Sequence, residues 1–95
     1  MMTELASLHA MVYGRVQGVF FRAFVSELAE ELGLTGYVCN LRYREAVEVQ
    51  AEGERKQLER LVDYLKIGPP AAEVEKVVSN WSEYTGGYSN FNIRY

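Results

Sequence analysis

The apolar residues of this 95-residue chain change spacing several times, and the order of these changes limits the folds open to it. Alternating apolar and polar residues are typical of a strand with one buried face, whereas apolar residues three and four apart indicate a helix packed on a core. The order is strand, helix, strand, strand, helix, strand, followed by a short strand-like tail. The predicted elements are strands at 7–13, 35–40, 46–51 and 74–81, helices at 22–32 and 54–66, and a last strand within 88–95.

Glycine and proline mark the ends of several elements. Gly33 follows the first helix pattern, and the Gly-Pro-Pro of residues 68–70 stops the second, because proline cannot continue a helix. Two helices and one sheet, each with a face to bury, predict a two-layer α+β sandwich of the ferredoxin-like kind, βαββαβ with an antiparallel sheet and a short C-terminal strand. The first strand then lies beside the third, which brings the loop after the first strand close to Asn40.

The composition predicts one globular domain over residues 1–95, with its core from about residue 7. The chain is 48% hydrophobic and 24% charged, with a net charge of −3. This charge disfavours general nucleic-acid binding, which depends on surplus Lys and Arg. No apolar run has the length of a membrane span or the pattern of a signal peptide, and a lone cysteine, Cys39, is typical of a reducing compartment. We therefore expect a cytoplasmic monomer without nucleic-acid or membrane partners.

The loop between the first strand and the first helix carries the clearest functional signal. Residues 14–22 read Gly-Arg-Val-Gln-Gly-Val-Phe-Phe-Arg. Such a loop can turn several backbone N–H groups toward one point, and the following helix adds the positive end of its dipole. Arg22 supplies a planar set of donors suited to phosphate. Because a cation is disfavoured at a helix N-terminus, a bound anion explains this arginine better than a surface role does. We predict a small phosphorylated ligand.

The familiar sets of catalytic residues are missing from the sequence. Residues 14–22 lack the Lys-Ser/Thr pair of a Walker A motif, no cluster has metal-ligand spacing, and His9, the single histidine, is best interpreted as an ordinary strand residue. No metal or cofactor is predicted. An arginine with several amides can then act only on a leaving group that needs no proton. The carboxylate of an acyl phosphate qualifies, since its conjugate acid has a pKa of about 4.

Two segments resemble the signatures of the acylphosphatase family. Residues 14–22 match the pattern G-R-V-Q-G-V-x-[FY]-R at every position, and residues 36–40, Gly-Tyr-Val-Cys-Asn, resemble the start of the second signature. The order of elements and the tyrosine-ended tail are similar too, so the resemblance covers residues from about 7 to 95. It implies hydrolysis of a small acyl phosphate by direct attack of an oriented water, without a cofactor. Inorganic phosphate would be the product and a competitive ligand.

The resemblance also implies roles for individual residues. Arg22 matches the family's phosphate-binding arginine, and Asn40 matches the asparagine that positions the attacking water. Residue chemistry alone does not distinguish Asn40 from Asn80, Asn90 or Asn92. The loop whose main-chain amides hold the phosphate matches Gln17, Gly18, Val19, Phe20 and Phe21.

Three positions depart from the family pattern. Cys39 stands where a basic or long side chain is usual, Tyr37 replaces the common tryptophan, and the turn at 41–45 is one residue longer and has no glycine. The hairpin must therefore turn without a residue that easily adopts a positive φ. Arg42 and Arg44 could add positive potential beside the site, although exposed loop cations are the favoured interpretation.

Two other functions remain open. The chain could be a non-catalytic acylphosphatase-like module that binds phosphate or carbamoyl phosphate. It could also be an RNA-binding module, because RNA-recognition domains share this order of elements. The third predicted strand, 46–51, contains no aromatic residue and carries an acid, which disfavours RNA recognition.

Overall fold

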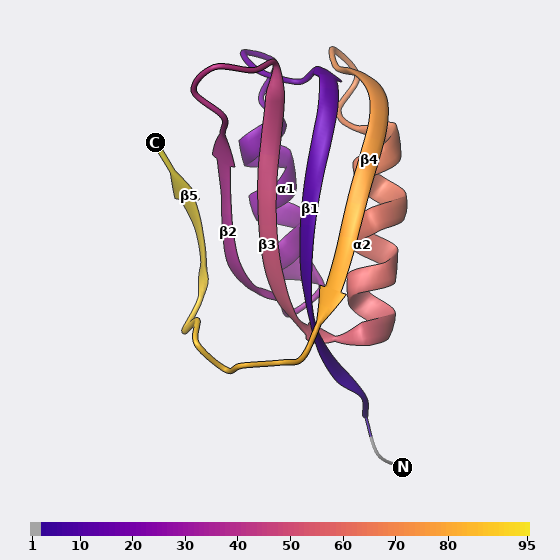
Figure 1. Cartoon of the computed structure of the whole chain (residues 1–95), viewed down its shortest axis with the longest axis vertical. Helices are drawn as coiled ribbons and strands as arrows, with labels where there is room; N and C mark the ends of the chain where they lie inside the picture. Colours follow the sequence, from indigo (N-terminus) through magenta and orange to yellow (C-terminus); the bar gives the residue numbers. More distant parts are fainter. Residues whose placement is uncertain (1–2) are drawn as a thin grey trace.

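The computed structural model describes residues 3–95, and within them all the elements predicted from the sequence are present. The elements are β1 (Leu5–Arg15), α1 (Phe21–Glu31), β2 (Thr35–Asn40), β3 (Ala46–Glu54), α2 (Arg55–Ile67), β4 (Glu73–Ser82) and β5 (Phe91–Arg94). Both helices cover the same face of one sheet (Figure 1). The fold is therefore the predicted two-layer α+β sandwich of the ferredoxin-like kind.

The strand order of the sheet is β4-β1-β3-β2-β5. β1 pairs antiparallel with β3 and β4, and β2 pairs antiparallel with β3, as predicted. β5 instead runs parallel to β2, so the sheet is mixed and not wholly antiparallel. The connection after β4 explains this difference. It crosses the end of the sheet from the β4 edge to the β2 edge, so that β5 enters in the direction of β2 (Figure 1).

The core lies between the helices and the inner face of the sheet. Alternate residues of β1 and β3 point to this face, and each helix adds an apolar stripe. Burial of one such side chain is worth about 1.5–3 kcal/mol relative to exposure. The large apolar side chains that are buried completely or almost completely include Leu8, Val12, Val16, Phe21, Val25, Val38, Val47, Val49, Leu58, Leu61 and Leu65.

Gly14 lies inside β1 and not in the loop that follows it. The pairing of β1 with β4 shifts its register between Tyr13 and Gly14, where Gly14 has a φ of 131°. A Cβ atom here would collide with the carbonyl oxygen of Glu73. The two glycines of the sequence motif therefore have different functions: Gly14 allows two strands to approach closely, and Gly18, which has open space around it, belongs to the loop.

Candidate active site

The loop between β1 and α1 contains two residues with left-handed backbone. Gly18 has a φ of 70° and Phe20 a φ of 61°, and Phe20 is the only non-glycine residue with a positive φ in residues 3–95. This conformation costs an L-residue roughly 1–2 kcal/mol, and such strain occurs preferentially at ligand sites. Left-handed residues in a loop turn successive N–H groups to one side. Phe20 is also the N-cap of α1, so the first N–H groups of the helix have no acceptor within it.

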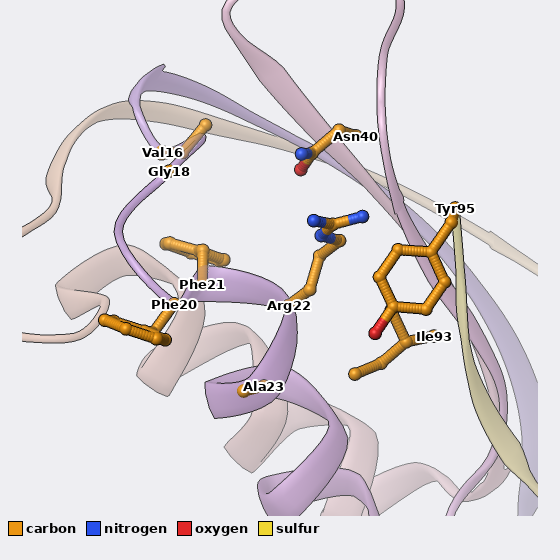
Figure 2. A pocket seen from close by; sticks show the side chains of 9 residues that line it. All are labelled: Val16, Gly18, Phe20, Phe21, Arg22, Ala23, Asn40, Ile93 and Tyr95. Carbon is orange, nitrogen blue, oxygen red and sulfur yellow. The ribbon is translucent and has the colours of Figure 1, made fainter.

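A cavity of about 290 Å³ lies between this loop, the start of α1 and the ends of β2 and β5. This volume is at the small end of the range for ligand sites. Figure 2 shows the side chains of Arg22 and Asn40 reaching into the same space from α1 and β2. The residues that line the cavity are Val16, Gly18, Phe20, Phe21, Arg22, Ala23, Asn40, Ile93 and Tyr95.

Arg22 is the second residue of α1, and an aromatic ring holds its side chain. The guanidinium carbon lies 4.7 Å from the centre of the Tyr95 ring, a cation–π contact worth about 0.5–1 kcal/mol at an exposed position. The salt bridges of residues 3–95 involve other side chains, so no carboxylate there neutralises Arg22. This cation can therefore meet an anion in the cavity.

Asn40 is the last residue of β2, where pairing with β3 places it opposite Val47. Its Oδ1 atom is buried, and no group in the described part of the chain donates a hydrogen bond to it. Nearly all buried polar atoms have a partner, and leaving one without costs about 1–3 kcal/mol. An acceptor of this kind beside a cavity is suited to a donor that enters with the ligand or with solvent.

The structure brings five of the predicted site residues to the cavity: Gly18, Phe20, Phe21, Arg22 and Asn40. Phe20 is 84% exposed, and its ring points away from Arg22 (Figure 2). Phe20 therefore contributes its backbone and the outer rim of the cavity, and its ring is not in the core.

Gln17 and Val19 do not line the cavity, although both were expected to offer amides to the ligand. Val19 packs against the core. The side chain of Gln17 turns instead to the connection between β2 and β3. Its Nε2 atom lies 2.9, 2.7 and 2.8 Å from the carbonyl oxygens of Leu41, Arg44 and Ala46. This one amide supplies hydrogen bonds to a turn that contains no residue with a positive φ.

Other parts of the site carried no recognisable signal in the sequence. Ile93 and Tyr95 reach the cavity because β5 pairs with β2, and the sequence predicted the strand but not its partner. Glu45, in the turn before β3, accepts the backbone N–H of Gln17 at 2.8 Å and that of Val16 at 3.3 Å through Oε2. The Gln17 amide is therefore bonded to a carboxylate in this structure. Arg42 and Arg44 are exposed and lie outside the cavity lining.

Cys39 lies on the opposite face of the sheet from Asn40, in a small polar cluster. Glu48 accepts hydrogen bonds from His9 at 2.8 Å and from the Cys39 thiol at 3.3 Å. Burial opposes ionisation of Glu48, but these hydrogen bonds outweigh it and lower its pKa. Burial raises the pKa of Cys39, and the bond to Glu48 adds to the rise. A thiol with a raised pKa is a poor nucleophile, and His9 is the hydrogen-bonded strand residue that was expected.

The helices of residues 3–95 include none with the length and apolar character of a membrane span. Within the same residues, no three His, Cys, Asp or Glu side chains are grouped so that they could hold a metal ion.

A sheet covered by helices on one face, with an amide-rich loop and an arginine at a helix N-terminus, defines a small α+β domain built to bind an anion. The family model for acylphosphatase matches residues 8–93. A relative named acylphosphatase from Dehalococcoides mccartyi (strain CBDB1) is 47% identical over 88 residues, which are 93% of this chain and 97% of that protein. The chain belongs to the acylphosphatase family.

Solved structures agree with this assignment. The crystal structure of acylphosphatase from Bacillus subtilis matches with a TM-score of 0.90 and 36% identity, over 95% of this chain and 99% of that chain. Full-length HypF in its phosphate- and nucleotide-bound form matches with a TM-score of 0.86 and 27% identity, over 99% of this chain but 12% of that chain. These comparisons confirm the family predicted from residues 14–22 and 36–40. They support an acylphosphatase function and do not favour the non-catalytic alternative.

Proposed function

We propose that this protein hydrolyses the carboxyl–phosphate bond of small acyl phosphates to a carboxylate and inorganic phosphate. The supporting observation is that Arg22, Asn40 and the amide-rich loop meet at one cavity. These groups suit an anion and a water molecule. The lining side chains include no histidine and no carboxylic acid. An acyl phosphate needs neither, because its leaving carboxylate is stable as an anion at neutral pH.

The loop and Arg22 bind the phosphoryl group. In residues 3–95 no acceptor is bonded to the N–H groups of Gly18 and Val19, and the first N–H groups of α1 are free of helical bonds. These donors hold the nonbridging oxygens, and the guanidinium of Arg22 donates two parallel hydrogen bonds to them. Because negative charge spreads over these oxygens in the transition state, donors fixed in advance stabilise that state most.

Asn40 orients the attacking water. Its buried Oδ1 accepts one O–H of the water and leaves a lone pair of the water directed at phosphorus. The new water O–P bond forms as the bond from phosphorus to the carboxylate oxygen breaks, in line with it. The carboxylate leaves with the bonding electrons, and the protons of the water remain with inorganic phosphate and solvent. No covalent intermediate forms.

Neither a metal ion nor a cofactor takes part, since Arg22 and the amides supply the positive field. We further propose that the protein acts as a cytoplasmic monomer without nucleic-acid or membrane partners, in keeping with its net charge of −3 and single cysteine. Inorganic phosphate, as the product, should compete with the substrate for the loop.

Hydrolysis of benzoyl phosphate by the purified protein with EDTA present tests this proposal, with Arg22→Ala assayed alongside. We expect turnover that EDTA does not change and that the variant loses. Inhibition by EDTA that added Mg²⁺ reverses would contradict the metal-free reaction. A wild-type protein that binds inorganic phosphate without turnover would identify a phosphate-binding module instead.

A further inference from the structure

Glu45 and Gln17 are bonded reciprocally between the β1–α1 loop and the β2–β3 turn. Glu45 Oε2 accepts the N–H groups of Val16 and Gln17 at 3.3 and 2.8 Å. In return, Gln17 Nε2 lies 2.7 to 2.9 Å from three carbonyl oxygens of the turn. These five contacts, the loop–turn network, join segments that are 24 to 29 residues apart in the chain.

A carboxylate at this position has an electrostatic cost for an enzyme that binds phosphate. Glu45 is exposed, and its carboxylate bonds to the loop that receives an anion, so its charge opposes substrate binding. Its hydrogen bonds to backbone N–H groups are charge-assisted and roughly twice as strong as neutral ones. Val16 is completely buried, and a buried N–H group needs an acceptor. The hydrogen bonds by which Glu45 holds the peptide groups of Val16 and Gln17 therefore explain its presence.

The loop–turn network reaches both halves of the proposed site. On one side, bonds to Val16 and Gln17 fix the peptide groups just before Gly18, where the backbone is otherwise free to change. On the other side, Gln17 bonds to the carbonyl oxygen of Leu41, the residue that follows Asn40. The N–H of Leu41 is bonded to Ala46 at 3.0 Å. The phosphate-binding loop and the end of β2 are thus connected outside the cavity.

We propose that Glu45 is a positioning residue, which acts through Val16 and Gln17 to hold the phosphate-binding loop at a fixed place relative to Asn40. Glu45 occupies the first two N–H groups of the loop, and those from Gly18 onward remain for the phosphoryl oxygens. In a turn that has no glycine, this network supplies rigidity that a tight glycine turn would have within itself. The assignment rests on the proposed function of the cavity.

Two charge-matched variants separate the hydrogen bonds of Glu45 from its charge. Glu45→Gln keeps an oxygen that can accept both N–H groups, whereas Glu45→Ala keeps none, and both remove the negative charge. We expect Glu45→Ala to bind inorganic phosphate about tenfold more weakly and to lower kcat by about tenfold, as loss of one charge-assisted hydrogen bond would. Glu45→Gln should stay within about threefold of the wild type for both. Tyr43→Ala, which changes an exposed, uncharged side chain of the same turn, is the control and should leave both values unchanged.

Amide hydrogen exchange gives a readout that does not depend on turnover. The N–H groups of Val16 and Gln17 should exchange slowly in the wild type and in Glu45→Gln, and faster in Glu45→Ala. Equal phosphate affinity in Glu45→Ala and the wild type, or equal tightening in both charge-removing variants, would overturn the role of Glu45. Phosphate binding and amide exchange test this role without any turnover. Failure of the wild-type protein to hydrolyse benzoyl phosphate would therefore count against the proposed reaction alone.

Discussion

β3 has a carboxylate near each end that accepts two backbone N–H groups, and the two differ in their surroundings. Glu52 accepts the N–H groups of Thr85 and Gly86 at 3.1 and 3.0 Å and the Thr85 hydroxyl at 2.9 Å, and it is 1% exposed. Glu45, just before β3, accepts its two N–H groups in an exposed turn. At the Glu52 end the protein satisfies its own polar groups, whereas beside Glu45 donors and an acceptor face a cavity. A carboxylate bonded to two backbone N–H groups is thus buried at one end of the sheet, here called the closed end, and lies beside the cavity at the other, here called the open end.

Glu52 at the closed end is connected through β5 to Arg22 at the open end. Burial opposes ionisation of Glu52, but hydrogen bonds from Thr85, Ser7 and Gly86 outweigh it and hold its pKa below the ordinary value. Glu52 thereby anchors the connection that carries the chain from β4 across the sheet (Figure 1). That connection leads to β5, which places Tyr95 over Arg22.

The largest effect expected at the open end is that of Arg22→Ala. Loss of the guanidinium should lower kcat/KM by 10²-fold or more, by analogy with removal of one preorganised donor. The free energy of unfolding should fall by no more than about 1 kcal/mol, because the side chain loses its contact with the Tyr95 ring and has no protein carboxylate to lose. Benzoyl phosphate kinetics and urea denaturation measure the two quantities. If Arg22→Ala lost stability and kept activity, Arg22 would have a structural role and not the functional role expected at the open end.

Asn40→Ala should affect kcat without affecting phosphate binding. We expect a decrease on the order of 10²-fold in kcat and an inhibition constant for inorganic phosphate close to the wild-type value, because Asn40 acts on the water. Stability should stay the same or rise, since a buried acceptor without a partner is removed. Asn80→Ala, on β4, is the matched control and should behave as wild type. Full activity in Asn40→Ala would show that another residue positions the water.

In contrast to Arg22→Ala and Asn40→Ala, Glu52→Gln should lower stability and leave activity nearly unchanged. The amide cannot accept charge-assisted bonds from Thr85 and Gly86, so we expect a loss of about 2 kcal/mol in the free energy of unfolding. For a domain of this size this corresponds to a decrease of roughly 10 °C in Tm. The rate per folded molecule should be nearly unchanged. Glu83→Gln, an exposed acid in the connection, is the control. An equal loss in both variants would mean that the buried contacts of Glu52 add little.

A smaller, pH-dependent effect should follow from the lowered pKa of Glu52. Because the folded state holds its pKa below the ordinary value of 4.5, the unfolded chain binds more protons in this range. The contribution of Glu52 to stability is therefore present above pH 4.5 and is lost as the pH falls through the folded-state value. Urea denaturation between pH 3 and 7 should show that the difference between wild type and Glu52→Gln shrinks on acidification. A difference independent of pH would contradict this linkage.

Most of the fold, and five of the residues that line the cavity, were predicted from the sequence. The pairing of β1 with β3 follows from the ferredoxin-like order, and it brings Gly18 and Arg22 to the same cavity as Asn40. Gly14 was expected in the loop but lies in β1, since a glycine at a close approach of two strands has the same sequence signal as a glycine in a loop. The side chain of Gln17 was not given a role, because its acceptors are carbonyl oxygens that any residues of the turn would provide.

By itself the sequence determined the succession of strands and helices, the amide-rich loop and the arginine at the helix start. Periodicity, glycine and proline act within a few residues of the chain, so their effects can be predicted locally. Only the tertiary structure decided that β5 runs parallel to β2, that Tyr95 lies over Arg22 and that Glu45 occupies the N–H of Gln17. Each of these contacts joins distant parts of the chain and depends on the path of a connection across the sheet or of a turn beside the loop. No local spacing encodes such a path, because the burial and hydrogen bonding that select it exist only once the layers have packed.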